Sequence, residues 1–279
     1  MANYTAADIK ALRERTGAGM LDVKKALDEA DGDAEKALEI IRVKGLKGVS
    51  KREGRAASDG LVAAEVTDGP DGQTGVLIEL NSETDFVAKN TTFIALAEKV
   101  LAAAVAAGTD DVAAVLASDL DGRTVQETID ETAATLGEKV VLRRVARLTA
   151  PAVSVYLHKV NKDLPPQVGV LLGTDEAGAA VGRDVAMHIA AFSPTFLNRD
   201  EVPAETVEAE RRISEETARN EGKPEAALTK IVEGRLTGFF KENVLLDQAY
   251  AKENKKSVGQ VLTEAGGTAT GFARFRVGA

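Results

Sequence analysis

The chain has no cysteine and no tryptophan, and only two of its 279 residues are histidines. Without cysteine there can be no disulfide bond, no thiolate nucleophile and no Cys-ligated metal. The two histidines, His158 and His188, lie far apart in the sequence, so we expect neither a zinc site nor any other bound metal.

Long apolar runs are also missing. No stretch approaches the roughly 18 consecutive apolar residues that a transmembrane helix needs. The first ten residues, MANYTAADIK, lack the apolar segment of a secretory signal. We therefore expect a cytoplasmic protein that does not bind a membrane.

The sequence contains none of the common enzyme motifs. It has no phosphate-binding GxxxxGK[ST] loop, no nucleophile elbow and no HExxH pair, so we expect no direct nucleotide binding, no cofactor and no catalytic residue. The net charge of −9 also disfavours a general nucleic-acid binder, which needs a basic surface. A protein that acts by binding another protein agrees best with these absences.

What is present predicts an α+β protein. Residues 1–43 have the spacing of three short helices, with Thr5 and Asp33 at helix starts. A linker follows at 44–58, with basic Lys44, Lys47, Lys51, Arg52 and Arg55. This segment could be a basic arm that touches an acidic partner. A solvated tether or a continued exposed helix is the interpretation we favour.

The rest of the chain indicates two related α+β subdomains with small antiparallel sheets. Predicted hairpins at 60–80 and 151–172 each precede an alanine-rich helix, at 93–107 and 184–192. We therefore divide this part into a core N-subdomain, a core C-subdomain and a helical hairpin inserted in the latter: 59–149, 150–279 and 204–241.

A helix and a strand separate the two subdomains, and another helix and strand close the second. Thr124 and Glu127 form a predicted capping box for a helix that stops at Gly137. The strand at 140–148 alternates apolar residues with arginines, which predicts one exposed basic face: Arg143, Arg144 and Arg147. A short helix capped at Ser257 and a strand at 270–277 end the chain.

The most informative segment is Glu79–Lys89, ELNSETDFVAK. A predicted strand at 75–80 ends in the turn residues 81–83, and Asp85 then stands beside Phe86 just outside the strand. Loops held by a rigid scaffold are where functional residues concentrate. The alternative is that Phe86 packs into the core and Asp85 caps the next helix.

This segment resembles the TDFV signature of the elongation factor Ts family. Residues 12–27, LRERTGAGMLDVKKAL, independently resemble the N-terminal signature of the same family. The resemblance extends from Tyr4 to about Gly278, so it covers nearly the whole chain. It implies a nucleotide exchange factor for the translational GTPase elongation factor Tu (EF-Tu), with residues 1–43 folded like a ubiquitin-associated (UBA) domain.

The resemblance also implies roles for particular residues. Asp85 and Phe86 would wedge into EF-Tu near its Mg²⁺ site and displace the ion, while Thr84 and Val87 would shape the loop. Other expected EF-Tu contacts are Arg13, Met20, Lys24, Leu136, Gly137 and His158. The partner would be EF-Tu in its GDP-bound and nucleotide-free forms, and a homodimer or a 2:2 complex is possible.

Two other functions are compatible with parts of the sequence. A UBA-type adaptor would use the three-helix domain and leave residues 59–279 without a role. An RNA-binding module would use the 44–58 segment and the arginines of strand 140–148, but it lacks interleaved aromatic residues and the net charge opposes it.

Overall fold

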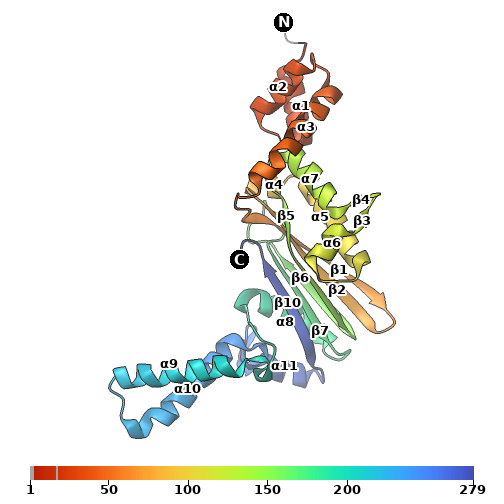
Figure 1. Ribbon diagram of the computed structural model, residues 1–279. Helices are drawn as coiled ribbons and strands as arrows, with labels where there is room; N and C mark the ends of the chain where they lie inside the picture. Colours follow the sequence, from red (N-terminus) through yellow and green to blue (C-terminus); the bar gives the residue numbers. More distant parts are fainter. Residues whose placement is uncertain (1–2, 17) are drawn as a thin grey trace.

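The computed structural model describes residues 3–16 and 18–279 and confirms the α+β class. The molecule is elongated: a helical bundle lies at one end, two sheets with their helices lie in the middle, and a helical hairpin extends from the other end (Figure 1). None of the helices in the described part of the chain combines the length and the hydrophobicity of a membrane-spanning segment.

The bundle contains the three predicted helices, α1 (Ala6–Thr16), α2 (Met20–Glu29) and α3 (Ala34–Arg52). Asp33 caps α3 by accepting hydrogen bonds from two main-chain N–H groups, as the sequence predicts. The helix continues to Arg52, so residues 44–52 are helical rather than a tether. The side chains of Lys47 and Lys51 lie outside the described residues.

The first sheet has the strand order β1-β2-β5. The hairpin β1 (Asp59–Gly69) and β2 (Gly72–Ser82) pairs antiparallel along its whole length, and β5 (Val141–Ala150) pairs antiparallel with β2. The chain between β2 and β5 forms α4 (Asp85–Ala88), α5 (Thr91–Ala107), α6 (Val112–Ala117), β3 (Asp119–Leu120), β4 (Arg123–Thr124) and α7 (Val125–Leu136). The predicted capping box of Thr124 and Glu127 opens α7.

The second sheet repeats this order as β6-β7-β10. Hairpin strands β6 (Ala152–His158) and β7 (Val168–Thr174) precede α8 (Ala179–Phe192), and β10 (Ala269–Arg276) pairs with β7. In both halves a hairpin is followed by a helix, and the last strand adds beside the second strand of the hairpin. This shared order agrees with the internal duplication that the sequence indicates.

The two sheets pack face to face through a shared apolar layer that includes Val62, Leu77, Val153 and Leu171. One glycine in each sheet permits this approach. A methyl group on Gly75 would lie 2.8 Å from Cγ1 of Val153, and one on Gly169 would lie 2.6 Å from Cδ1 of Leu77. Side chains at either position would push the sheets apart.

The prediction that β5 has one exposed basic face is wrong for Arg144. Alternation along β5 places Arg144 on the same face as Ala146 and Leu148, which pack between the sheets, while Arg147 projects from the other face. A β-bulge at Arg143 shifts the register between the pairs Glu79↔Arg144 and Leu80↔Leu142, and this moves Leu142 to the face opposite to Arg144. Its Nε donates to Oε2 of fully buried Glu79 at 2.6 Å. Residue types along the strand do not reveal this ion pair, because only the pairing of β2 with β5 brings Glu79 and Arg144 opposite each other.

The predicted helical hairpin is formed by α9 (Ala204–Asn220) and α10 (Glu225–Asn243), which project away from the sheets (Figure 1). Gly222, at a φ of +71°, ends the first helix and Pro224 caps the second. The remaining elements surround its base: η1 (Arg199–Glu201), η2 (Leu245–Asp247), β8 (Ala249–Tyr250), β9 (Glu253–Ser257) and α11 (Val258–Glu264).

Candidate functional site

The TDFV segment forms one isolated helical turn, α4, directly after the end of β2. Thr84 is its N-cap residue, and its Oγ1 accepts a hydrogen bond from the N–H of Val87 at 3.4 Å. The hydroxyl of Ser82 donates to the main-chain carbonyl of Thr84 at 3.0 Å. The end of β2, the Thr84 cap and the helical turn together hold the backbone from which the side chains of Asp85 and Phe86 project.

Phe86 points outward from this turn, and the residue is 68% exposed. The residues after it are anchors: Val87 is 5% exposed and packs in the core under the first sheet, and Ala88 is 1% exposed. The alternative prediction, a core position for Phe86 with Asp85 as the helix cap, is therefore wrong. Asp85 is exposed and is the first residue of α4, one position after the cap.

Lys89 contacts both functional candidates of this turn. Its ammonium lies 4.2 Å from the centroid of the Phe86 ring and 3.9 Å from Oδ2 of Asp85. Both interactions are solvent-exposed, and each is worth less than about 1 kcal/mol. Lys89 was not among the predicted site residues, although its spacing of four from Asp85 could have indicated an ion pair on a helix.

A network of hydrogen bonds ties the turn to the segment that follows α7. The N–H and Oγ1 of Thr84 donate to the carboxylate of Glu138 at 3.0 and 2.6 Å. The carboxylate of Glu83 accepts from the N–H of Lys139 at 2.7 Å and from Arg55 at 3.2 Å. Lys139 in turn donates to the main-chain carbonyl of Arg55 at 3.1 Å.

Three chain segments therefore meet at the base of the turn: the residues after α3, the end of β2 and the residues after α7. Sequence reasoning missed Glu138 and Lys139, because a carboxylate 54 residues away carries no local signal of its partner. The network makes the turn a firmly mounted structure rather than a free loop.

Burial raises the pKa of Glu138 above its ordinary value, outweighing the hydrogen bonds from Thr84, which favour the ionised form. A raised carboxyl pKa stabilises the folded state most at low pH, and this contribution is lost as the pH rises through the folded-state pKa. Glu138→Gln cannot ionise, so its stability relative to the natural protein should increase as the pH rises above 4.5. Urea unfolding of both proteins over a pH series measures this difference.

Glu127→Gln is the matched control, because a hydrogen bond from the main chain of Thr124 lowers the pKa of Glu127. A lowered carboxyl pKa gives stability that is lost as the pH falls through it, so this variant should lose relative stability as the pH rises. The same trend for both variants would contradict the assignment for Glu138.

Two predicted contact residues lie next to this network. Leu136 is buried at the end of α7, and Gly137 ends the helix in the left-handed conformation, with a φ of +78°. Glu138, which binds Thr84, follows directly. The structure thus brings Gly137 close to the turn, while the side chain of Leu136 belongs to the core.

His158 is exposed at the end of β6, and its Nδ1 lies 3.1 Å from the hydroxyl oxygen of Tyr156. The β6–β7 turn contacts β1, where the N–H of Val62 donates to the carbonyl of Pro166 at 2.9 Å. The start of β1 pairs with the end of β2, at Asp59↔Ser82. His158 therefore lies at the end of the sheets from which α4 begins. His188 lies on α8 and is instead buried inside the fold.

The other predicted contacts, Arg13, Met20 and Lys24, lie exposed on the bundle, away from the sheets (Figure 1). Met20 is 60% exposed, and its neighbour Leu21, which sequence reasoning missed, is 72% exposed. An adjacent pair of exposed large apolar side chains at the start of α2 marks this surface as a contact candidate.

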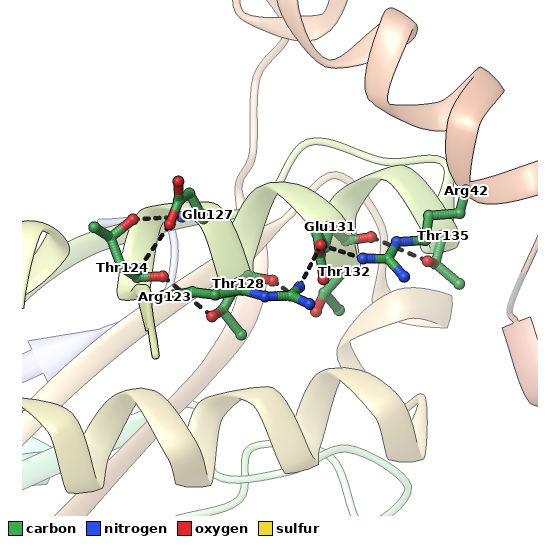
Figure 2. A network of polar contacts seen from close by, with 8 residues as sticks. All are labelled: Arg42, Arg123, Thr124, Glu127, Thr128, Glu131, Thr132 and Thr135. Carbon is green, nitrogen blue, oxygen red and sulfur yellow. Dashed lines mark hydrogen bonds and ion pairs between the residues drawn. The ribbon is translucent and has the colours of Figure 1, made fainter. Parts of the chain in front are cut away.

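Helix α3 fixes the bundle against α7. A methyl group on Gly45 would lie 2.0 Å from the carbonyl oxygen of Ala134, so only glycine permits this helix–helix contact. Beside it, the carboxylate of Glu131 pairs with Arg42 of α3 and with Arg123 of β4 (Figure 2). Helix α7 carries Glu131, which pairs with the bundle, and it ends just before Glu138, which binds the N-cap residue of α4. The bundle and α4 are therefore both attached to α7.

The site has the features of a protein-binding surface. In the described part of the chain, no cluster of three or more His, Asp or Glu residues has the geometry to hold a metal ion. An exposed aromatic ring beside a carboxylate, mounted on buried anchors, presents a shape and a charge to a partner.

Comparison with known proteins agrees with the two sequence signatures. A family model described as elongation factor TS matches residues 83–279. The chain is 70% identical to elongation factor Ts of Beutenbergia cavernae, 65% identical to that of Renibacterium salmoninarum and 66% identical to that of Micrococcus luteus, in each case over the whole of both chains. The chain therefore belongs to the elongation factor Ts family.

Proposed function

We propose that the chain is a translation elongation factor that binds EF-Tu·GDP in the cytoplasm and accelerates release of GDP. It would act by protein–protein binding, without covalent chemistry. The observation that carries this proposal is the exposed ring of Phe86 between exposed Asp85 and buried Val87. A large aromatic ring that its own fold holds out beside a carboxylate, on a turn with buried neighbours, is available to anchor a partner.

The proposed mechanism acts on the metal that helps EF-Tu to retain GDP. Mg²⁺ bridges phosphate oxygens and requires near-ideal octahedral geometry, at about 2.0–2.1 Å. Inserting the Phe86 ring near this site would move the groups that surround the ion. The carboxylate of Asp85 would disturb the water and carboxylate network around it. A small displacement is enough to remove much of the affinity for GDP.

The mounting of α4 supports this role. A wedge transmits force only if its base resists displacement, and the hydrogen bonds from Thr84 to Glu138 and from Lys139 to Glu83 supply that resistance. Because the turn is ordered before binding, less of the interaction free energy is lost in fixing it.

The remaining contacts would add affinity. His158 would approach the phosphate-binding loop of EF-Tu from the same end of the sheets, and Gly137 would lie near α4. Met20, with Arg13 and Lys24, would dock on the GTPase domain as a second contact. Since Gly45 and Glu131 fix the bundle on α7, the two contact regions have a defined spacing.

The factor supplies no driving force for exchange. If its binding weakens that of GDP by some ratio, GDP must weaken binding of the factor by the same ratio. The factor would accelerate both release and rebinding, and the cellular excess of GTP over GDP would set the direction.

Size-exclusion chromatography of the chain mixed with EF-Tu·GDP tests the proposal. We expect a complex that elutes earlier than either protein and contains no nucleotide, and added GDP should dissociate it. Light scattering on the same peak separates a 1:1 from a 2:2 complex. Two proteins that elute separately, or a complex that retains its full GDP content, would contradict the proposal.

A further inference from the structure

Tyr156 and His158 lie on the same face of β6, because alternate residues of a strand project to one side. Their ring centroids are 6.0 Å apart with an angle of 29° between the ring planes. The hydroxyl oxygen of Tyr156 is 3.1 Å from Nδ1 of His158. The two side chains are thus joined at one particular nitrogen of the imidazole.

The chemistry of the two groups decides which one donates. A phenol hydroxyl is a good donor, and the unprotonated nitrogen of a neutral imidazole is a better acceptor than a phenol oxygen. Tyr156 therefore donates to Nδ1, which places the ring proton of neutral His158 on Nε2. Among the described residues, Nε2 of His158 has no hydrogen-bond partner, and the residue is exposed.

We propose that Tyr156 is a positioning residue for His158. It holds the imidazole in the Nε2–H tautomer and aims this donor outward, toward an acceptor oxygen of EF-Tu. This inference rests on the proposed function, because it assigns His158 a contact in the exchange complex. Tyr156 itself would not touch EF-Tu.

The surroundings of Tyr156 suit this role. Its ring is half-buried and packs against the core between the second sheet and α8. The guanidinium of Arg183, on α8, lies 5.8 Å from the ring centroid. The backbone of His158 is held separately, since its carbonyl accepts from the N–H of Gln167 at 2.9 Å. The hydrogen bond with Tyr156 therefore restrains the side-chain torsion angles of His158 and not its backbone.

His188 provides a comparison within the same chain. Its Nε2 lies 2.9 Å from Oε1 of Gln248, and its Nδ1 accepts from the N–H of Ala251 at 3.2 Å. Both nitrogens of His188 are used inside the fold, as expected for a structural histidine. His158 has an internal partner at one nitrogen and directs the other to solvent, as expected for a residue that binds a second molecule.

A double-mutant cycle tests whether Tyr156 acts through His158. Tyr156→Phe keeps the ring and removes the donor, so it should slow factor-stimulated GDP release by about two- to tenfold, the range for one lost hydrogen bond. His158→Ala should slow release at least as much, and adding Tyr156→Phe to it should have no further effect. Tyr4→Phe, which loses a hydrogen bond to Asp28 in the bundle, is the matched control and should not change the stimulated rate.

Nitrogen-15 NMR of the full-length free protein reads the tautomer directly. With only two histidines in the chain, His158→Ala assigns the signals. The natural protein should show the Nε2–H form of His158, and Tyr156→Phe should shift it toward a mixture. A purely structural role for Tyr156 would leave the tautomer unchanged.

A second pair of variants does not depend on Tyr156→Phe folding well. His158→Gln places its amide near the position of Nε2, and His158→Asn places it near Nδ1. The glutamine variant should therefore retain more stimulated release than the asparagine variant. Equal loss in both would overturn the inference.

The outcomes separate this inference from the proposed function. An unchanged tautomer in Tyr156→Phe, or effects that simply add in the double variant, would overturn the role of Tyr156 alone. So would normal release with His158→Ala while Phe86→Ala abolishes stimulation. If Phe86→Ala also leaves release unchanged, the proposed function fails as well.

Discussion

Replacing Phe86 with alanine should slow factor-stimulated release of GDP from EF-Tu by about thirtyfold or more. Buried aromatic anchors at the centre of an interface are typically worth about 2–4 kcal/mol when truncated, and each 1.36 kcal/mol is about tenfold in rate. Phe86 is 68% exposed in the free protein, so most of its surface is available to a partner. Stopped-flow release of fluorescent GDP from EF-Tu measures the effect.

The substitution should affect the rate of release far more than the affinity for nucleotide-free EF-Tu. The wedge acts on the path by which Mg²⁺ and GDP leave, whereas the bundle and His158 would still contribute to binding. The variant should remain folded, because removing an exposed side chain usually changes the free energy of unfolding by no more than about 0.5 kcal/mol.

Phe192→Ala is the matched control for this prediction. Phe192 is also an exposed aromatic residue, at 53%, but it lies at the end of α8, far along the chain from α4. Stimulated release should be close to that of the natural protein. Normal release with Phe86→Ala, or an equal loss with Phe192→Ala, would refute the wedge.

Replacing Arg144 with alanine should lower the free energy of unfolding by about 3 kcal/mol, because breaking a buried ion pair leaves one charge uncompensated. Its partner Glu79 is fully buried, while the side chain of Arg144 is 33% exposed. Arg144 also donates to the carbonyl of Arg276 at 2.9 Å and lies 4.5 Å from the centroid of the Phe275 ring. It therefore connects both sheets, and its loss removes several contacts together.

Equilibrium unfolding in urea measures this change. Arg147→Ala, on the exposed part of the same strand, is the control and should alter stability by no more than about 0.5 kcal/mol. Replacing the pair together, as Glu79→Leu with Arg144→Met, should recover much of the loss, since no buried charge then remains unpaired. Equal stability of the Arg144→Ala and Arg147→Ala proteins would contradict the assigned role.

Much of the fold could be predicted because its signals are local. Asp33 and Thr124 identify helix starts through hydrogen bonds within three residues, and both caps form as expected. The hairpins follow from apolar runs separated by turn residues. The TDFV segment gave the position of the candidate site and the family, since a short signature is contained wholly in the sequence.

The orientation of particular side chains could not be predicted in this way. Whether Phe86 enters the core or faces solvent depends on which residues cover it. The residue types around Phe86 are the same for both orientations, so they do not distinguish them. Arg144 meets Glu79 in the layer between the sheets only because β2 and β5 pair in this register. Lys139 and Glu138 contact the residues before α4 only after the fold brings 83–84 and 138–139 together.

The sequence by itself determined the family, the caps, the paired hairpins and the residues that carry the signature, because each depends on near neighbours or on the order of residue types. Tertiary structure alone decided that Phe86 is presented outward, that Glu138 holds its cap, that Glu79 is buried against Arg144, and that α3 continues to Arg52 along α7. These features depend on contacts between residues up to 89 positions apart, such as Arg42 and Glu131, and their geometry exists only when the chain is packed.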